Sequence, residues 1–298
     1  MTELVVFEVP GMSTGDHLID ADVDADGRVA CLVERNGRTL VLRDGTEVTG
    51  VPEAAMPFLH TIRWLPDDAL LLHPIVAVTD APIQSCAIVA GEDFRPVPFG
   101  APDNLAAGGG FVFASYTERA LIFTRVGSHE DDVVTVFGVR GAARLFGLPD
   151  LLPDVRGGPD PYKVTSGCAT ARGEFVFIGQ DSPHLWSLDA TARTHHAVPL
   201  EDALGDPDAA SVSADGGHAV LLLVNEAGLH LRRVDRATGR TVRTGQLTAG
   251  LVRDALGSFA SPRPAGGWLL DAEARGLDGG RFVVRTADRL ALIRQATA

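Results

Sequence analysis

A short unit made of a strand and a tight turn recurs along the whole chain. Apolar runs of three to five residues, rich in Val, Leu, Ile and Phe, are each bounded by Gly, Asp or Pro: Val29–Val33, Leu40–Leu42, Phe111–Ala114, Phe175–Ile178, Val220–Val224 and Phe282–Val284. Runs of this length between turn residues are typical of β-strands, and no sustained 3.6-residue periodicity is present. The same criteria leave only short helical candidates, at Glu53–Leu59, Glu201–Leu204 and Leu251–Leu256. The pattern therefore predicts an all-β protein.

The turns repeat as well. The sequence DADG at 24–27 precedes a strand in the same way as SADG at 213–216, and DGGRF at 278–282 resembles DGGHA at 215–219. Glycine supplies the positive φ that such turns need, and aspartate bonds to the turn backbone. If this turn joins the first two strands of each unit, it occurs at Gly27, Asp68, Gly110, Gly173, Gly217 and Gly280, in steps of 41, 42, 63, 44 and 63 residues. A further 45 residues lead through both chain ends back to the first position.

This spacing resembles that of β-propellers, in which each blade is a four-stranded antiparallel sheet. The resemblance implies a single domain over residues 1–298 with six blades, in which the N-terminal strand Leu4–Val9 pairs beside Leu290–Arg294 and covers the edge of the last blade. Seven blades or a pair of β-sandwiches are the alternatives. The length is also that of propeller lyases that open macrocyclic lactones, but no recurring motif of that kind is present. The Trp-Asp dipeptide of WD40 blades and the metal-ligating repeat of lactonase-like propellers are missing too, so the resemblance is one of architecture.

Two of the steps between units are longer by about twenty residues, and the insertions fall near 142–163 and 248–267. Both lie between the last strand of one unit and the first strand of the next. In a propeller these connections share one face with the loops that follow the second strands, where binding sites usually gather. The insertions are therefore either lids over a pocket or plain surface loops.

Polar residues follow the apolar runs that are expected to be second strands. They are Glu34, His73, Tyr116, Gln180 and Asn225, with Asp181 just beyond Gln180. Around one axis they would form a polar-rimmed cavity, although any strand becomes polar where it leaves a core. The only lysine, Lys163, adjoins Tyr162, which with Tyr116 makes up the tyrosines of the chain. A lysine beside an aromatic wall can act as a base or form a Schiff base, or it can simply be solvated.

Two acidic segments resemble cation sites. The sequence DVDADG at 22–27 matches the opening of an EF-hand loop, but the twelfth position is Val33 where a glutamate is required. The sequence HEDD at 129–132 is better explained as a hairpin tip. No zinc-ligand spacing, phosphate-binding loop, dinucleotide fingerprint or serine-hydrolase elbow is present. We therefore predict neither a dedicated metal site nor a cofactor, and a weak cation site stays open at these two segments only.

Composition limits the partners. The chain has 39 acidic and 26 basic residues and a formal net charge of −13, which disfavours nucleic acid and anionic membranes. Three cysteines, no apolar stretch of 18 residues and no basic region at the N-terminus predict a cytoplasmic protein without a secretory signal. All but one of the basic residues are arginines, which indicates a bacterium with a GC-rich genome and favours a biosynthetic pathway.

These observations favour a propeller that binds a small organic molecule on its loop face. If it is an enzyme, a lyase, hydrolase, isomerase or cyclase without a cofactor is expected, with acid–base residues drawn from His73, Tyr116, His184 and Lys163. Glu34, Tyr162, Gln180, Asp181 and Asn225 are the candidate binding residues. The alternative is a non-catalytic platform that holds a basic protein or peptide on the same face.

Overall fold

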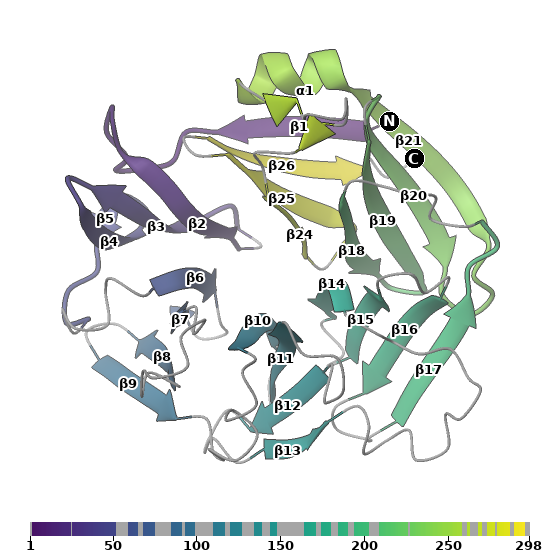
Figure 1. Ribbon diagram of the computed structural model, residues 1–298, viewed down its shortest axis with the longest axis horizontal. Helices are drawn as coiled ribbons and strands as arrows, with labels where there is room; N and C mark the ends of the chain where they lie inside the picture. Colours follow the sequence, from purple (N-terminus) through teal and green to yellow (C-terminus); the bar gives the residue numbers. More distant parts are fainter. Residues whose placement is uncertain are drawn as a thin grey trace. The chain divides into compact units, whose positions relative to one another are not determined.

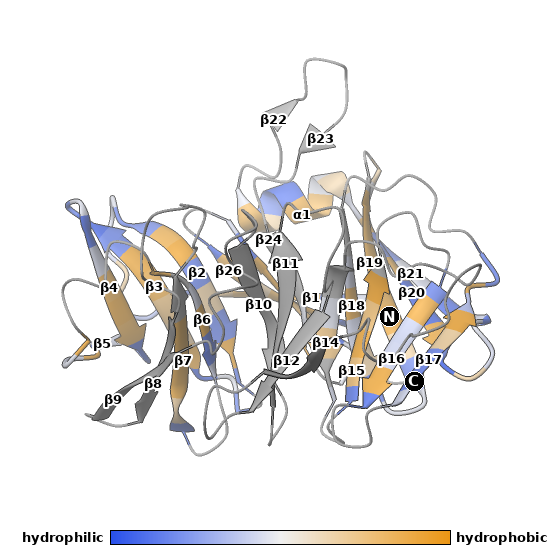
Figure 2. Ribbon diagram, turned by 60° about the horizontal axis from the view of Figure 1, so that its bottom comes forward, coloured by the Kyte–Doolittle hydropathy of each residue, from blue (hydrophilic) through white to orange (hydrophobic). Residues whose placement is uncertain are grey.

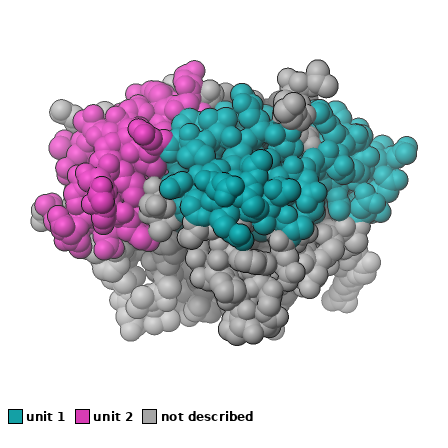
Figure 3. Space-filling view, turned by 90° about the horizontal axis from the view of Figure 1, so that it is seen from above, with its two compact units in different colours: residues 1–7, 149–298 teal, residues 8–148 magenta. Residues whose placement is uncertain are grey.

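The computed structural model contains two compact units, which are shown in different colours in Figure 3. Unit 1 comprises residues 1–7 and 149–298, and unit 2 comprises residues 8–148. The structure describes residues 2–24, 26–51, 59–64, 68–74, 85–90, 93–98, 110–116, 120–126, 134–138, 144–147, 164–170, 174–179, 184–189, 194–202, 209–225, 227–257, 261–262, 268–269, 273–277, 279–286 and 289–295.

Unit 2 contains three four-stranded sheets among its described residues, and in each sheet the strands follow one another in chain order. The first sheet is β2 (His17–Val23), β3 (Val29–Arg35), β4 (Arg38–Arg43) and β5 (Thr46–Glu47). The second is β6 (Leu59–Trp64), β7 (Leu70–Pro74), β8 (Ser85–Ala90) and β9 (Asp93–Pro98). The third is β10 (Gly110–Tyr116), β11 (Ala120–Val126), β12 (Val134–Gly138) and β13 (Arg144–Gly147). All of their pairings are antiparallel.

Unit 1 contains three further four-stranded antiparallel sheets among its described residues. Two of them keep chain order: β14 (Val164–Ala169), β15 (Glu174–Gly179), β16 (His184–Asp189) and β17 (Thr194–Pro199), then β18 (Ala209–Asp215), β19 (His218–Asn225), β20 (Gly228–Asp235) and β21 (Thr241–Thr248). Between these and the last sheet lie helix α1 (Ala249–Leu256) and the short pair β22 (Ser261–Pro262) and β23 (Trp268–Leu269). The all-β prediction is therefore confirmed (Figure 1).

The last sheet of unit 1 is completed from the other end of the chain. Its strands are β24 (Glu273–Leu277), β25 (Arg281–Arg285), β26 (Leu290–Gln295) and β1 (Thr2–Phe7), in that order. β1 runs antiparallel to β26, with Leu4 opposite Ile293 (Figure 1). The predicted pairing of the two chain ends is confirmed, but the strand ends at Phe7 and not at Val9, which is buried.

Apolar side chains from neighbouring sheets form the core. In unit 2, Leu32 and Val41 pack with Ile62, Leu70 and Leu72 of the next sheet. In unit 1, a separate set joins the sheet that contains β19 to the sheet that contains β25: Val220, Leu222, Leu229, Phe282, Val284 and Ile293. Figure 2 shows the apolar colour along β3 and β19, which are second strands of their sheets. Because both faces of these strands are covered, they are continuous apolar runs without alternation.

Helix α1 confirms one of the predicted helices. Thr248 caps it, because its hydroxyl oxygen accepts a hydrogen bond from Leu251 N at 3.3 Å, and Gly257 ends it with a φ of 82°. The candidate at Glu53–Leu59 lies almost wholly outside the described residues, and its last residue begins β6. Of the candidate at Glu201–Leu204, Glu201 and Asp202 are described, and both lie in a bend.

One reference position of the repeat was wrong. Five of the six positions lie between the first and second strands of a sheet, but Gly110 is the first residue of β10. The glycine run at 108–110 resembles a hairpin turn in the sequence, whereas the connection between β10 and β11 falls at 117–119 and contains no glycine. None of the helices in the described part of the chain is long and apolar enough to cross a membrane.

Candidate functional site

The turns of each four-stranded sheet lie at the two ends of its strands, and these two ends, as distinct from the edge strands, are called edges here. The first-hairpin edge is the end with the turn between the first and second strands. Because the strands are antiparallel, this edge also carries the turn between the third and fourth strands. The second-hairpin edge carries the turn between the second and third strands. Most of the predicted site residues belong to the second-hairpin edge.

In unit 2, Glu34 and His73 lie near this second-hairpin edge. Glu34 is the penultimate residue of β3 and is exposed, and His73 is the penultimate residue of β7, paired with Thr61. The side chain of His73 lies outside the description. The position of Tyr116 differs from the prediction, because Tyr116 is the last residue of β10. It therefore ends a first strand and lies at the first-hairpin edge of its own sheet, opposite to the edge predicted from the misplaced glycine turn.

In unit 1, Asn225 and His184 flank second hairpins. Asn225 ends β19, and His184 begins β16 with a half-buried ring 6.5 Å from the Trp186 ring. Gln180 and Asp181 fall in the hairpin between β15 and β16, outside the described residues. Tyr162 and Lys163 also lie outside them, as does the acidic segment 129–132.

Helix α1 joins the second-hairpin edges of two neighbouring sheets in unit 1. At its start, Ala249 N donates to Ala227 O at 3.0 Å, and at its end Ala255 O accepts from Arg289 Nη1 at 3.0 Å. Ala227 lies in the turn between β19 and β20, and Arg289 in the turn between β25 and β26. Val252 and Leu256 of the helix are fully buried with the apolar residues of both sheets. The helical part of the 248–267 insertion thus seals the core beside this edge.

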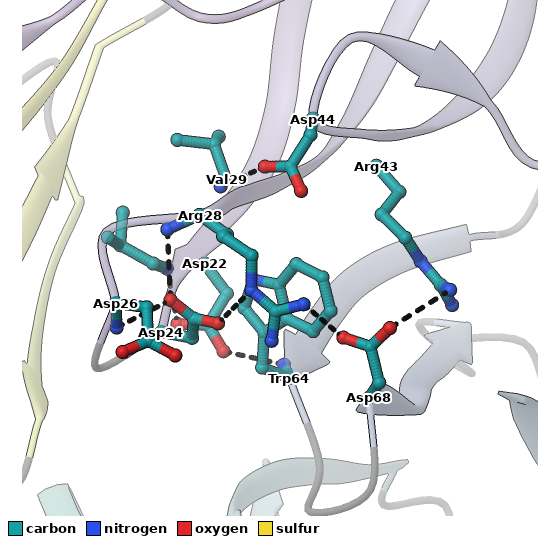
Figure 4. Close-up of polar contacts among 10 residues, drawn as sticks. Asp22, Asp24, Asp26, Arg28, Val29, Arg43, Asp44, Trp64 and Asp68 are labelled. Atoms are coloured by element: carbon teal, nitrogen blue, oxygen red, sulfur yellow. Dashed lines mark hydrogen bonds and ion pairs between the residues drawn. The ribbon is translucent and has the colours of Figure 1, made fainter.

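The first-hairpin edge of unit 2 holds a cluster that the sequence did not predict (Figure 4). The Arg28 guanidinium lies 4.7 Å from the centre of the Trp64 ring, and Arg43 lies 5.7 Å from it. Arg28 also donates to Asp24 at 2.6 Å and to Asp68, while Arg43 is 3.8 Å from Asp68. Cation–π contacts of this kind contribute about 0.5–1 kcal/mol each at exposed sites. The cluster joins the turns of two adjacent sheets.

The acidic run at 22–26 is part of the same arrangement. Asp22 accepts hydrogen bonds from Val23 N and Trp64 N, both at 2.8 Å. Asp24 accepts from Asp26 N and Arg28 N at 2.9 Å, and from the Arg28 side chain. These oxygens are occupied by N–H donors, so the resemblance to a calcium loop is explained by turn and strand contacts. Among the described residues, no group of three or more His, Cys, Asp and Glu side chains is placed to hold a metal ion.

Asp20 makes a second contact between the same sheets. Its carboxylate accepts from Ile62 N at 2.9 Å and from the Arg63 guanidinium, and both ionic side chains are buried. Ile62 and Trp64 belong to β6, the first strand of its sheet. The side of β6 that does not pair with β7 would otherwise present unpaired N–H groups. Asp20 and Asp22 therefore act as a carboxylate latch on β6.

The first-hairpin edge of unit 1 is also occupied by ion pairs. Arg236 donates to Glu174 at 2.8 Å and to the Ser187 hydroxyl at 3.0 Å. Arg233 pairs with Asp215 at 2.6 Å, and its second nitrogen lies 3.2 Å from His218 Nδ1. These contacts join the turns within and between sheets, as the Arg28 cluster does in unit 2.

Comparisons with solved structures identify the fold. No protein-family model and no curated protein matches the chain. A virginiamycin B lyase from Staphylococcus aureus matches with a TM-score of 0.58 at 10% identity, covering 99% of this chain and 100% of that one. The WD40 repeats of RRP9 match with a TM-score of 0.54 at 12% identity over 98% and 97%. The chain has a β-propeller fold. At these identities the likeness extends to the fold alone.

The described cysteines, Cys31 and Cys168, are poor candidates for a nucleophile. Burial raises the pKa of the Cys31 thiol to about 12, with a further contribution from the Asp20 carboxylate. Cys168 is buried as well. A thiol with such a pKa is not a nucleophile at neutral pH. The prediction that Cys31 is a small buried apolar residue is confirmed.

In the part of unit 2 that the structure describes, the second-hairpin edge contains the ion pair of Arg35 with Asp16. Arg35 donates to Asp16 at 2.7 Å and to Gly11 O at 2.7 Å. The Arg35 hydrogen bond, followed by one from Ser13 N, lowers the pKa of Asp16. The Glu34 side chain, next to Arg35, is exposed and makes no hydrogen bond or ion pair with the described residues. Its main chain pairs with His17 and Thr39 in the sheet.

Proposed function

We propose that this β-propeller binds a small organic molecule at its second-hairpin edges. The observation that carries the proposal is the exposed Glu34 carboxylate at the second-hairpin edge of unit 2, which has no side-chain partner among the described residues although its neighbour Arg35 is paired with Asp16. At the first-hairpin edges, the carboxylates and guanidiniums bind one another and the backbone, as in the Arg28 and Arg236 clusters. Displacing such groups would leave charges without their partners, so these edges are suited to holding the sheets together.

The second-hairpin edges supply the proposed ligand contacts. Glu34, Asn225, Gln180, Asp181 and Tyr162 are proposed to bind the ligand, and His73, His184 and Lys163 are the proposed acid–base residues. Tyr116 is left out of this set, because it ends a first strand. Helix α1 supports the edge in unit 1 by fixing the two turns that it contacts.

We further infer that the six four-stranded sheets are the six blades of the propeller. Each has the antiparallel order expected of a blade, and the last is completed by the N-terminal strand as in a ring closed by its chain ends. The proposed reaction, if the bound molecule is transformed, is a non-redox step of the lyase, hydrolase, isomerase or cyclase type.

The first probe follows from the comparisons. One of the similar solved structures is a catalytically inactive virginiamycin B lyase with quinupristin. Quinupristin is therefore a sensible member of a ligand panel, together with smaller organic acids, esters and lactones. The panel is tested by thermal unfolding of the protein with each compound. A ligand present at one hundred times its Kd stabilises the protein by about 2.7 kcal/mol.

The variants Asn225→Ala, His184→Ala and Glu34→Ala test the location. Each should weaken the response to a stabilising compound, by about tenfold in affinity where one hydrogen bond of about 1.4 kcal/mol is lost. Arg240→Ala is the matched control, because its side chain is 73% exposed and lies away from the second hairpins. An unchanged response in all three variants contradicts the proposed site. The alternative is the non-catalytic interaction platform. It would be favoured if a protein binds, no small molecule competes with it, and the same three variants lose that binding.

A further inference from the structure

Three polar side chains lie in a row at the second-hairpin edge of unit 2. Glu34 of β3 pairs with His17, the first residue of β2, on one side and with Thr39 of β4 on the other. Residues directly opposite each other in an antiparallel sheet point to the same face, with Cβ atoms about 4.5–5.5 Å apart. The row therefore presents an imidazole, a carboxylate and a hydroxyl side by side on one face of the sheet.

The side chains of this row take no part in holding the sheet together. His17 and Glu34 are exposed and Thr39 is half-buried, and none of the three side chains makes a hydrogen bond or an ion pair with the described residues. The neighbouring arginines, Arg35 and Arg38, are opposite each other and point to the other face of the sheet. The Glu34 carboxylate thus has two polar neighbours on its own face but no cation bound to it.

We infer that this row binds the ammonium group of a primary amine. An ammonium group has three N–H donors, and the row offers an acceptor for each: the Glu34 carboxylate, the Thr39 hydroxyl oxygen and the unprotonated nitrogen of a neutral His17 imidazole. The contact with Glu34 is charge-assisted, and a chain with a net charge of −13 attracts cations. The inference rests on the proposed function, because it assigns a chemical class to the ligand of the same edge.

A divalent metal ion matches the row less well than an ammonium group. Calcium and magnesium take six or more oxygen ligands, most of them in fixed positions around the ion. The row supplies one carboxylate and one hydroxyl, and its third member is a nitrogen ligand. Three acceptors on neighbouring strands suit a group that itself carries three donors.

Three compounds with the same alkyl chain test the assignment: hexylamine, hexanol and hexanoate. Each is titrated into isotope-labelled protein at neutral pH, and the amide signals of His17, Glu34 and Thr39 are followed by NMR. We expect the amine to shift these signals and to bind at least about tenfold more tightly than the alcohol, because its bond to Glu34 is charge-assisted. Hexanoate should bind least, because Glu34 repels it. An amine that binds no more tightly than the alcohol overturns the inference.

Substitutions in the row give the second test. Glu34→Gln keeps the shape of the side chain and removes its charge, so it should abolish the preference for the amine over the alcohol. Thr39→Val and His17→Ala should each weaken amine binding by about two- to tenfold, since each removes one hydrogen bond. Asp26→Asn is the matched control, because Asp26 is exposed at the first-hairpin edge of the same sheet. A preference that persists in Glu34→Gln, or is lost equally in Asp26→Asn, contradicts the ammonium site.

The ammonium site and the proposed function fail in different ways. If compounds without an amine stabilise the protein through Glu34 and hexylamine does not bind, the ligand edge stands and the ammonium assignment is wrong. If hexylamine binds through Glu34 while Asn225→Ala and His184→Ala leave every ligand response unchanged, the row binds amines but the proposed site does not extend to unit 1.

Discussion

In each unit, two neighbouring sheets contact each other through their first strands, but the residues that make the contact differ in kind. In unit 2, the first strands β2 and β6 meet through buried carboxylates: Asp20 and Asp22 accept the N–H groups of Ile62 and Trp64. The Arg63 guanidinium neutralises Asp20 in the interior. This boundary depends on charged groups that must stay paired.

In unit 1, the first strands β18 and β24 meet through small residues. The Ser213 hydroxyl donates to Leu277 O, in the opposite sense to the carboxylates of unit 2. Gly276 of β24 lies so close to Val212 that a Cβ atom would overlap the Val212 carbonyl. Ser213 and Asp22 make corresponding contacts, because each bonds to the main chain of the last residue of the neighbouring first strand, Leu277 of β24 and Trp64 of β6.

In both units the side of a first strand that is not paired within its own sheet needs partners, but these partners can be of different kinds. A carboxylate can accept N–H groups across a wider gap, at the cost of burying a charge that needs a partner. A hydroxyl and a glycine allow the backbones themselves to approach. Stability should therefore fall at the β2–β6 boundary when one charge of the pair is removed, and at the β18–β24 boundary when a small residue is replaced by a larger one.

The largest effect is expected for Asp20→Ala. Removal of this carboxylate breaks the buried ion pair with the Arg63 guanidinium and should lower the free energy of unfolding by about 3–5 kcal/mol. Asp20→Ala combined with Arg63→Met removes both charges and should recover much of the loss. Urea unfolding of the two variants measures the difference. A double variant no more stable than Asp20→Ala would mean that the charge pair is not what the boundary depends on.

Gly276→Ala should rank next, at about 3 kcal/mol, since the added methyl group meets fixed backbone atoms of β18 and not a movable side chain. Gly217→Ala is the matched control in the same region, because its Cβ would have nothing within 4 Å. Both are compared by urea unfolding. Equal, small losses would show that β18 and β24 do not approach as closely as described.

Asp22→Ala and Ser213→Ala compare the corresponding contacts. The first removes the acceptor for buried Trp64 N and should cost about 1–3 kcal/mol, and the second removes one hydroxyl donor and should cost about 1 kcal/mol. Asp22→Asn keeps an acceptor oxygen and should fall between wild type and Asp22→Ala. The order of thermal midpoints checks this, and a reversed order would contradict the assignment of the latch to unit 2.

The smallest effect concerns pH and a pair outside both boundaries. Arg35 lowers the pKa of Asp16 in the folded protein, so the contact stabilises the fold above the ordinary value of 3.8. The stabilisation is lost as the pH falls through the lowered pKa. Below about pH 4, Arg35→Gln should therefore lose less stability than wild type with decreasing pH. Parallel acid-unfolding profiles of the two proteins would contradict the contact.

Local patterns in the sequence predicted the strands, the closing strand and helix α1, because apolar runs, turn residues and capping residues act over a few positions. They failed at Gly110, where a glycine run before a strand resembles a hairpin, and this displaced Tyr116 to the wrong edge. They also missed the Arg28, Trp64 and Asp68 cluster, since its members come from two sheets and only folding brings them together. The alternating aspartates at 20–24 were the available signal, but the run at 22–27 was compared only with a calcium loop and a hairpin turn, and not with acceptors for a neighbouring strand.

The most direct test is hydrogen exchange with and without a compound that raises the thermal midpoint. If the ligand binds at the second-hairpin edges and the first-hairpin edges hold structural ion pairs, backbone amides in 34–39, 180–184 and 225–228 gain protection, and those in 24–28 and 213–218 do not change. Protection confined to the latter two segments would contradict this assignment, because the edge assigned to structure would then be the binding edge.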